Sequence, residues 1–329
     1  MVANFCDNAT MGLVALVLGL AWDRLIGEPQ RWHPLVAFGR WAERCEGWVR
    51  QRFVPANGEP LTLDKLRRYH WRERLAGVLA WAGAVAPPLV AYGWLTAAFP
   101  KLTWFWDGAV LGVALGWRSL DEHVRAVVRA QRTGDLAAAR TAVARIVSRD
   151  ALLLDERGVA TAATESALEN GHDAVIAPLV WFAIAGGWGV LLHRMANTLD
   201  AMWGYRTPRY RDFGWFAARM DDLLGWPSAR VTAFAYALAG ATRAALTCWR
   251  NQAPHWPSPN AGPVIAAGAG ALGVRLGGQA PYEGRWVARP LLGCGALPTT
   301  DTPLAALALL YRATWGVIVL VALVKGATG

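Results

Sequence analysis

Three carboxylates recur at helical spacing in the stretch ESALENGHDAVIAPL, residues 165–179. Glu165, Glu169 and Asp173 follow one another at intervals of four residues, so they share one face of a helix. Like charges at this spacing repel one another unless a cation, an Arg side chain or a ligand lies between them. The stretch therefore suggests a magnesium or substrate site, with Asn170 beside it, at the mouth of the apolar segment that follows. A solvated acidic helix face is the alternative.

A second polar stretch, residues 196–226, is dense in both charge signs. Guanidinium groups offer forked donors for phosphate or carboxylate, and paired Asp side chains can hold a hard cation. The stretch could therefore bind a metal–nucleotide complex, although mutual salt bridges would explain the same residues. Its candidate side chains are Asn197, Asp200, Tyr205, Arg206, Arg209, Tyr210, Arg211, Asp212, Arg219, Asp221 and Asp222.

Three shorter polar segments could add substrate contacts. The segment DRLIGEPQRWHPLVAFGR contains Asp23 and His33, with turn-forming Gly and Pro residues just after the first apolar run. The turn-rich segment SPNAG contains Asn260, and GVRLGG, which contains Arg275, follows it closely. Each segment is a weak signal alone, and a lone His is more often structural than catalytic.

Several familiar chemistries are absent from the sequence. It has no GxxxxGK[ST] phosphate loop, no GxGxxG, no GxSxG and no HExxH motif, so the common soluble nucleotide, hydrolase and zinc-protease folds are not supported. The four Cys residues stand far apart without CxxC spacing, which indicates neither a zinc site nor a disulfide framework. The net charge of +9 comes mainly from Arg in loops, and no nucleic-acid-binding module accompanies it.

The polar stretches must be positioned by membrane helices. Of the 329 residues, 54% are hydrophobic and only 17% are charged, whereas about a quarter are charged in soluble proteins. Residues 75–100 and 174–192 contain no charged side chain, and about 20 helical residues cross a bilayer core. Many of the 19 Trp lie near the ends of apolar runs, which suggests rings at headgroup level. Contact with a flat ligand is the other possibility.

We expect an all-α, polytopic integral membrane protein with five to seven membrane-embedded segments and polar cytoplasmic loops, forming one domain over residues 1–329. The candidate segments are residues 9–22, 75–99, 102–117, 174–192, 231–249, 261–274 and 303–324. The first reads as a retained span, since it lacks signal-peptide features. Residues 75–99 and 102–117 would form a hairpin, and residues 135–147 a soluble or interfacial helix.

The charge pattern does not agree with a single membrane crossing by residues 174–192. Arg-rich stretches precede and follow residues 174–192, and the positive-inside rule assigns both to the cytoplasm. One crossing cannot join two cytoplasmic loops. Either this segment dips in and returns, which Pro178 and the Gly186–Gly187 pair would permit if protein surrounds it, or the preceding hairpin contains only one span.

Taken in order, these segments resemble the CobD/CbiB family of cobalamin biosynthesis, from residue 23 to about residue 286. The most specific segments are ATESALENGHDAVIAPL, NTLDAMWGYR, RYRDFGWFAARMDDL, SPNAG and GALGVRLGG. The sequence departs from the family at His172 and Ala174, where an aliphatic residue and Gly are usual, and at residues 263–265, where Pro-Val-Ile replaces Trp-Pro-Glu. Any acid role of that lost Glu cannot be transferred.

The resemblance implies an adenosylcobinamide-phosphate synthase activity. Such an enzyme joins a propionate of the corrinoid adenosylcobyric acid to aminopropanol or its phosphate, with ATP and Mg²⁺, and we expect an acyl phosphate intermediate. It would lie in the inner or plasma membrane with its active site facing the cytoplasm. The lipid bilayer, other cobalamin-pathway enzymes and a second copy of the chain are the further candidate partners, and nucleic acid is not one.

With this resemblance, roles can be assigned to the candidate residues. For catalysis we expect Glu165, Glu169 and Asp173, and for metal binding Glu165, Glu169, Asp221 and Asp222. For nucleotide or phosphate binding we expect Arg206, Arg209, Arg211 and Asp212. For substrate binding we expect Asp23, His33, Asn170, Asn197, Asp200, Tyr205, Asn260 and Arg275.

Two other classes of protein remain open. The chain could be a membrane sensor or signalling protein like the related AmpE proteins, although its intact polar motifs argue against that. It could also be a transporter, with Asp107, Arg243 and Arg312 inside apolar runs as pathway charges. Snorkelling or pairing between helices would explain those charges as readily.

Overall fold

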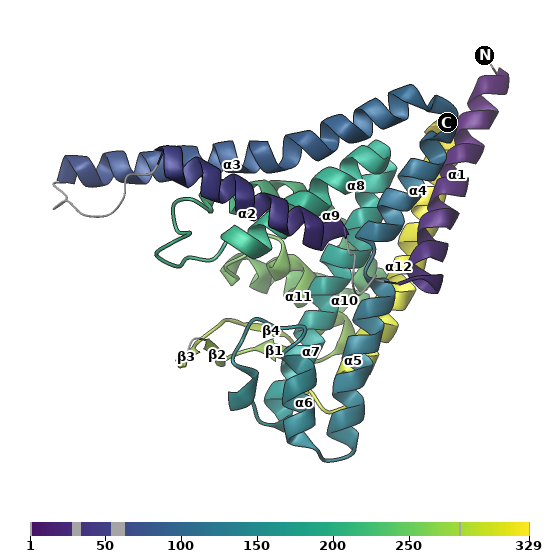
Figure 1. Ribbon diagram of the computed structural model, residues 1–329. Helices are drawn as coiled ribbons and strands as arrows, with labels where there is room; N and C mark the ends of the chain where they lie inside the picture. The colour runs from purple at the N-terminus through teal and green to yellow at the C-terminus, as the bar shows by residue number, and fades with distance from the viewer. Residues whose placement is uncertain (1, 28–33, 54–62, 283, 329) are drawn as a thin grey trace.

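The computed structural model describes residues 2–27, 34–53, 63–282 and 284–328. His33, expected as a substrate contact, lies outside this part of the chain. The described chain is almost entirely helical (Figure 1), as the sequence predicts. Its α-helices are α1 (Val2–Leu25), α2 (Pro34–Phe53), α3 (Leu63–Ala98), α4 (Thr103–Ala114), α5 (Trp117–Arg132), α6 (Leu136–Val143), α7 (Glu156–Gly171), α8 (Ala177–Trp203), α9 (Trp215–Ala239), α10 (Thr242–Gln252), α11 (Ala261–Leu272) and α12 (Thr302–Thr328).

Four short strands in the part after α11 are the exception to the all-helical pattern. The strands β1 (Arg275–Gly277) and β4 (Leu291–Gly293) pair antiparallel, and so do β2 (Ala280–Tyr282) and β3 (Arg285–Val287). Glycines with positive φ follow or interrupt these strands, which suits tight turns. The GVRLGG segment therefore forms a small β-structure at the end of the molecule where α5, α6 and α7 also lie (Figure 1).

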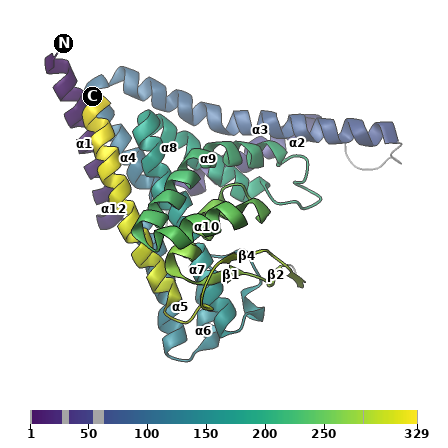
Figure 2. The same ribbon diagram turned by 180° about the vertical axis from the view of Figure 1, so that it is seen from behind.

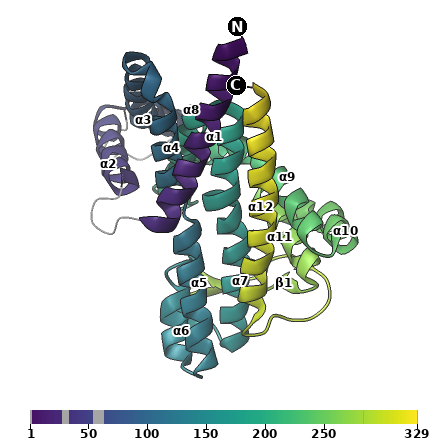
Figure 3. The same cartoon turned by 90° about the vertical axis from the view of Figure 1, so that its right-hand side faces the viewer.

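The prediction of an all-α membrane protein is confirmed. Within the described residues, three helical stretches are long and apolar enough to cross a bilayer by length and composition: His70–Ala98, Glu156–Trp203 and Thr302–Ala327. Figure 2 shows α12 lying along α1 at one edge of the bundle, and Figure 3 shows α2 and α3 on one side of that pair with α10 and α11 on the other. The number of true membrane crossings stays a prediction.

Small residues bring the helices of this bundle close together. A Cβ atom at Gly112 of α4 would lie 2.6 Å from the side chain of Trp22 on α1, and one at Gly19 of α1 would meet Leu111. Close approach of backbones is the usual way in which membrane helices pack, because lipid gives no hydrophobic drive for helices to associate. In α11, every residue from Ala261 to Ala271 is buried, so this 12-residue helix is a core element and not a span.

Two predicted segments were wrong in their boundaries or partners. Residues 231–249 do not form one segment, because the chain breaks at Gly240 between α9 and α10, where the Ala241 N–H donates to the carbonyl of Ala271 at 3.0 Å. The turn predicted between residues 75–99 and 102–117 is present at Pro100–Leu102, but the two helices do not pack along their length. Instead α3 packs mainly on α2, α8 and α9, and it meets α4 through the hydrogen bond between Tyr92 and Asp107 (Figure 1). A Pro at the connecting turn fits both arrangements, so the sequence could not distinguish them.

Helix α8 reverses direction inside the protein. Ala185 and Gly186 leave the helical conformation, and the φ of +57° at Gly186 is readily adopted only by Gly. The rings of Trp181 and His193 stack with centroids 6.5 Å apart, whereas 12 residues of straight helix would separate them by about 18 Å. Residues 174–192 therefore turn back on themselves, which is the geometry that the first of the two explanations for the charge pattern requires, while the membrane crossings themselves stay a prediction.

The reversal is capped by a carboxylate from a neighbouring helix. Asp107 of α4 accepts a hydrogen bond from the Gly187 N–H at 3.0 Å and another from the Tyr92 hydroxyl of α3. A helix that restarts inside apolar surroundings exposes unpaired N–H groups, and an anionic acceptor satisfies one of them and complements the helix dipole. Asp107, a candidate transport charge, thus has a structural partner.

Candidate functional site

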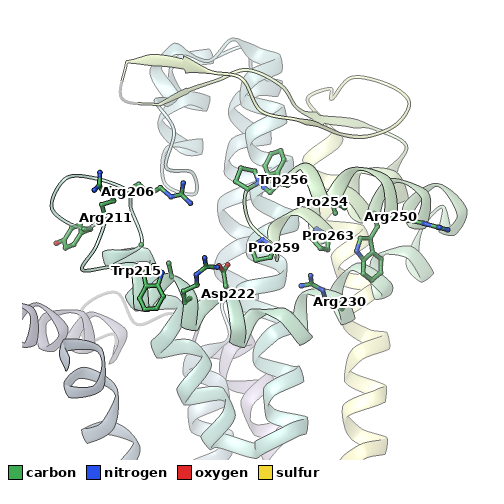
Figure 4. Close-up of a pocket in the computed structure, with 18 residues that line it drawn as sticks. Arg206, Arg211, Trp215, Asp222, Arg230, Arg250, Pro254, Trp256, Pro259 and Pro263 are labelled. Carbon is green, nitrogen blue, oxygen red and sulfur yellow. The ribbon is translucent and has the colours of Figure 1, made fainter. Parts of the chain in front are cut away.

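A cavity of about 680 Å³ opens between the start of α9 and the segment that links α10 to α11. The labelled side chains in Figure 4 come from both sides, with Arg206, Arg211 and Trp215 on one side and Trp256 and several Pro residues on the other. Asp222 lies between these two sides (Figure 4). We call this space the α9 cavity.

The lining of the α9 cavity is strongly basic and aromatic. It includes the guanidinium groups of Arg206, Arg211, Arg219, Arg230 and Arg250, against the single carboxylate of Asp222. Forked guanidinium donors match phosphate and carboxylate oxygens, and aromatic faces suit flat rings. The aromatic lining residues are Tyr210, Trp215, Trp249 and Trp256. The cavity is therefore suited to a large anion with a planar part, such as a nucleotide.

The loop between α8 and α9 carries part of this lining and is tied to α2 and α3. Arg209 donates to the Glu46 carboxylate at 2.8 Å, and Arg50 donates to the Arg209 carbonyl at 2.7 Å. Asp212 lies 2.6 Å from Nδ1 of His70 and accepts from Arg74. Of the residues predicted to bind phosphate, Arg206 and Arg211 line the cavity, whereas Arg209 and Asp212 form the salt bridges that the sequence left as the alternative.

Asn260 joins the two sides of the cavity. Its side-chain amide donates to the Asp222 carbonyl at 3.0 Å, and its side-chain oxygen accepts from Arg230, also at 3.0 Å. A Cβ atom at Gly225 would lie 2.5 Å from the Asn260 amide nitrogen, so α9 has no room for a larger residue there. Asn260 was predicted as a substrate contact, and its observed contacts position Arg230 at the cavity wall.

Carboxylates from three helical segments gather behind Asp222. Asp221 interacts electrostatically with Asp173, Asp200 and Asp222, and Glu169 interacts with Asp173. We call these five residues, Glu169, Asp173, Asp200, Asp221 and Asp222, the acidic patch. The reversal of α8 makes the patch possible, because it returns Asp200 to the level of Asp173. Carboxylates of the two polar stretches therefore come together in the structure.

The crowding of the acidic patch shifts the pKa values of its carboxyl groups. Burial, followed by repulsion from Asp173 and Asp200, raises the pKa of Asp221 to about 8, although Asn197 donates a hydrogen bond to it at 3.3 Å. Burial also raises the pKa of Asp222, against the effect of Arg219. A bound cation would relieve this repulsion. The patch therefore has the chemistry of a cation site.

The acidic patch does not amount to a complete metal site. In the part of the chain that the structure describes, no group of three or more His, Cys, Asp or Glu side chains is arranged to hold a metal ion. Magnesium commonly binds through one or two carboxylates and completes its shell with water and substrate phosphates. Asp221 and Asp222, adjacent to the basic cavity, fit that mode of binding.

Glu165, predicted as a catalytic and metal-binding carboxylate, is saturated by hydrogen bonds in this structure. It is buried and accepts from Arg149 at 2.5 Å, from Arg289 at 2.9 and 3.1 Å, and from the Gly277 N–H at 2.7 Å. Its oxygens have no free position for a metal ion in this arrangement. The contacts instead make Glu165 the residue that positions two arginines.

The remaining predicted substrate residues are spread over several places. Asp23 accepts from the N–H groups of Trp117 and Arg118, so it caps α5. Asn170 donates to Ser166 beside the acidic patch, and Arg275 lines a separate pocket. Tyr205 is exposed on the loop before α9. Asp23 is thus a structural residue here, while the roles of the others stay predictions.

Several lining residues were missed by the sequence analysis. Arg230, Arg250 and Trp256 line the α9 cavity, and Trp249 was expected only as a headgroup anchor. The run of Trp and Pro around SPNAG was a usable signal for this wall, because Pro residues fix an exposed turn beside aromatic rings. No local signal pointed to Arg149, whose partner lies on another segment.

Comparison with known proteins confirms the family. The profile of the family described as CobD/Cbib protein matches residues 16–310. The chain is 54% identical over 289 residues to "Cobalamin biosynthesis protein CobD" of Stutzerimonas stutzeri, covering 88% of this chain and 90% of that protein. The protein of the same name from Chromobacterium violaceum is 50% identical over 301 residues, which cover 91% of this chain and 92% of that protein. The one from Mycobacterium tuberculosis is 38% identical over 290 residues, which cover 87% of each chain.

No solved structure matches the chain. The family therefore rests on sequence, and the site geometry above rests on this chain alone. With the profile covering most of its length and relatives far above 30% identity, the chain belongs to the CobD/CbiB family.

Proposed function

We propose that this chain is an amide-forming ligase of cobalamin biosynthesis, which joins adenosylcobyric acid to aminopropanol or its phosphate and uses ATP. The coarser part, a role in cobalamin biosynthesis, is supported by the family and by the names of the relatives. The observation that carries the finer part is the α9 cavity, in which five arginines face Asp222 of the acidic patch.

The α9 cavity would bind ATP. Arg206 and Arg211 on the loop, with Arg230 opposite them, would hold phosphate oxygens, while the Trp and Tyr rings offer a surface for the base. The corrinoid is much larger than this cavity. It would lie across the opening and present one propionate side chain to the site.

The chemistry follows from the weakness of a carboxylate as an acyl donor. The propionate oxygen would take the γ-phosphoryl group of ATP and release ADP, which converts the carboxylate into an acyl phosphate. The amine nitrogen would then attack the acyl carbon, and inorganic phosphate would leave. The proton lost by the amine needs an acceptor, and the exposed Glu169 carboxylate, at the edge of the acidic patch, would take that role.

Asp221 and Asp222 would hold Mg²⁺ together with the phosphates of ATP. When bound there, the ion supplies charge neutralisation for the phosphoryl transfer. The residues of the chain itself contribute in two other ways: the arginines orient the phosphates, and Asn260 fixes Arg230 against α9. Orientation of this kind can supply much of the rate of a bimolecular reaction.

The proposal includes a location in the inner or plasma membrane with the α9 cavity facing the cytoplasm. The loop that lines the cavity is rich in Arg, and such segments stay on the cytoplasmic side. ATP is also available on that side. Two of the three candidate charges of the transporter alternative have structural partners, because Asp107 caps α8 and Arg312 donates to the carbonyl of Ala239 at the end of α9.

One experiment tests the proposal directly. Detergent-purified protein would be incubated with adenosylcobyric acid, aminopropanol phosphate, ATP and Mg²⁺, and the amide product and ADP would be followed by mass spectrometry. We expect equimolar amide and ADP, and a loss of roughly 10²–10⁴-fold in kcat for Glu169→Gln, the usual worth of a general base. Glu122→Gln, which removes an exposed carboxylate on α5, is the matched control. Intact protein that forms no amide would overturn the proposal.

A further inference from the structure

A second basic pocket lies at the start of α7. Its volume is about 330 Å³, and it is lined by the segment before α7, the first turns of α7 and the strands β1 and β4. We call it the α7 pocket. Its lining contains Arg149, Arg157, Arg275 and Arg289, together with the glycines that follow Leu276.

The α7 pocket has an excess of positive charge among the residues that form it. Arg149 and Arg289 share the single carboxylate of Glu165. Asp155, the carboxylate in the lining, accepts from the Gly158 N–H at 2.7 Å and caps α7. Arg157 and Arg275 are exposed and add two further charges. An anion is the ligand that would balance this set.

The two inner arginines are held in place before any ligand arrives. The side chains of Arg149 and Arg289 are only 9% and 10% exposed, and both are fixed by Glu165. Arg289 also donates to the Gly278 carbonyl at 3.2 Å. Fixed, poorly hydrated guanidinium groups bind anions better than mobile surface arginines, because less ordering and desolvation is needed on binding.

Arg289 also connects the α7 pocket to the α9 cavity. Its guanidinium carbon lies 5.3 Å from the ring centroid of Trp256, and Trp256 lines the α9 cavity. The two spaces are therefore neighbours on either side of this cation–π pair. Glu169 interacts electrostatically with both Arg149 and Arg289, so the acidic patch reaches the α7 pocket as well.

We propose that the α7 pocket binds the phosphate group of the amine substrate, separately from ATP. This inference rests on the proposed function and assigns the second substrate a place. The pocket has about half the volume of the α9 cavity, which suits a small phosphomonoester and not a nucleotide. With its phosphate held by the arginines, a short amino alcohol ester would extend its ammonium group toward Glu169.

The geometry favours the phosphorylated amine over the free amino alcohol. Free aminopropanol carries only a positive charge at neutral pH, and four lining arginines would repel it. The phosphate ester carries about −1.5 to −2 charges in addition and can accept several charge-assisted hydrogen bonds. The pocket therefore selects the amine by its phosphate.

Binding measurements on the full-length protein in detergent test the inference. Isothermal titration would give the Kd of aminopropanol phosphate, of aminopropanol and of a non-hydrolysable ATP analogue, for the wild type and for the double variant Arg157→Gln/Arg275→Gln. Both substituted residues are exposed, so folding should be retained. We expect the Kd of the phosphate ester to rise at least tenfold, with the nucleotide Kd changed by less than about twofold, since each charge-assisted bond contributes about 1.5–3 kcal/mol.

Two control variants test whether the effects are specific to each pocket. Arg145→Gln removes an exposed Arg outside the α7 lining and should change neither Kd. Arg206→Gln, in the α9 cavity, should weaken the nucleotide and leave the phosphate ester unchanged. Inorganic phosphate should compete with the ester for binding to the wild type, and this competition should disappear in the double variant.

The outcomes separate this inference from the proposed function. Unchanged ester affinity in the double variant, or an equal loss of nucleotide affinity, overturns the α7 assignment even if the amide forms. Ester binding that depends on Arg157 and Arg275 supports the assignment even if no amide forms, in which case the proposed ligase activity alone fails. Tighter binding of free aminopropanol than of its ester would also overturn it.

Discussion

The α9 cavity and the α7 pocket are both basic, but they hold their arginines in different ways. In the α9 cavity the side chains of Arg211 and Arg219 are 63% and 67% exposed and lie 3.6 and 3.9 Å from the nearest carboxylates. In the α7 pocket Arg149 and Arg289 are nearly buried and share Glu165. The first site can adapt to a large, changing ligand, whereas the second is built for one small anion.

The largest difference between the two sites should appear in stability. Glu165→Gln would leave the buried Arg149 and Arg289 without their counter-charge, and breaking a buried ion pair typically costs about 3–5 kcal/mol. We expect a clear fall in the Tm of the detergent-solubilised protein, measured by intrinsic fluorescence. The matched substitution Glu122→Gln, at an exposed pair with Arg118, should leave Tm nearly unchanged. Equal Tm values for the two variants would contradict the picture of a rigid α7 pocket.

The next effect concerns nucleotide affinity in the α9 cavity. Replacing both Arg206 and Arg211 by Gln should raise the KM for ATP by at least about 100-fold, because charge-assisted hydrogen bonds contribute about 1.5–3 kcal/mol each and about 1.4 kcal/mol is a factor of ten. Stability should change little, since both side chains are exposed. Steady-state kinetics with saturating amine would measure it. A rise in the KM for the amine instead would mean that the two cavities have been assigned the wrong way round.

Salt should distinguish the two sites by a smaller factor. Raising the NaCl concentration from about 0.05 to about 0.5 M screens exposed charges much more than buried ones. Nucleotide affinity is therefore expected to fall more than affinity for the phosphate ester, because two of the four α7 arginines, Arg149 and Arg289, are nearly buried and keep their attraction, as measured by titration at each concentration. Parallel losses would show that the α7 arginines are as solvated as those of the α9 cavity.

The smallest effect is expected for the salt bridge that ties the loop to α2. Arg209 is 64% exposed, and an exposed pair contributes about 0.2–1 kcal/mol. Arg209→Gln should therefore lower Tm only slightly and leave the KM for ATP within about twofold. A loss of ATP affinity as large as that of the Arg206/Arg211 variant would restore Arg209 to the phosphate-binding role predicted from the sequence.

The sequence was informative where a function depends on neighbours in the chain. Carboxylates at helical spacing predicted the acidic face of α7, and the apolar runs predicted the main helices. The Arg-rich loops on both sides of residues 174–192 left two possible paths for this segment, because charge bias constrains which side of the membrane a loop occupies. These signals are local or additive along the chain, so they survive without knowledge of packing.

The sequence failed where the partner of a residue is remote. Glu165 looked like a metal ligand, but its partners Arg149 and Arg289 lie 16 and 124 residues away. Arg209 looked like a phosphate ligand, but Glu46 is 163 residues away. An Arg or a carboxylate has the same appearance in a sequence whether it binds a ligand or another side chain. Only the fold determines which of the two occurs.

The reversal of α8 has a consequence for how the protein is made. The apex N–H of Gly187 needs an acceptor inside apolar surroundings, and Asp107 of α4 supplies it. Because α4 precedes α8 in the chain, this acceptor is already synthesised when the apex emerges from the ribosome. The order of elements along the chain therefore matches the order in which their hydrogen-bond partners are needed during biogenesis. Circular permutants that place α8 ahead of α4 would lose that advantage.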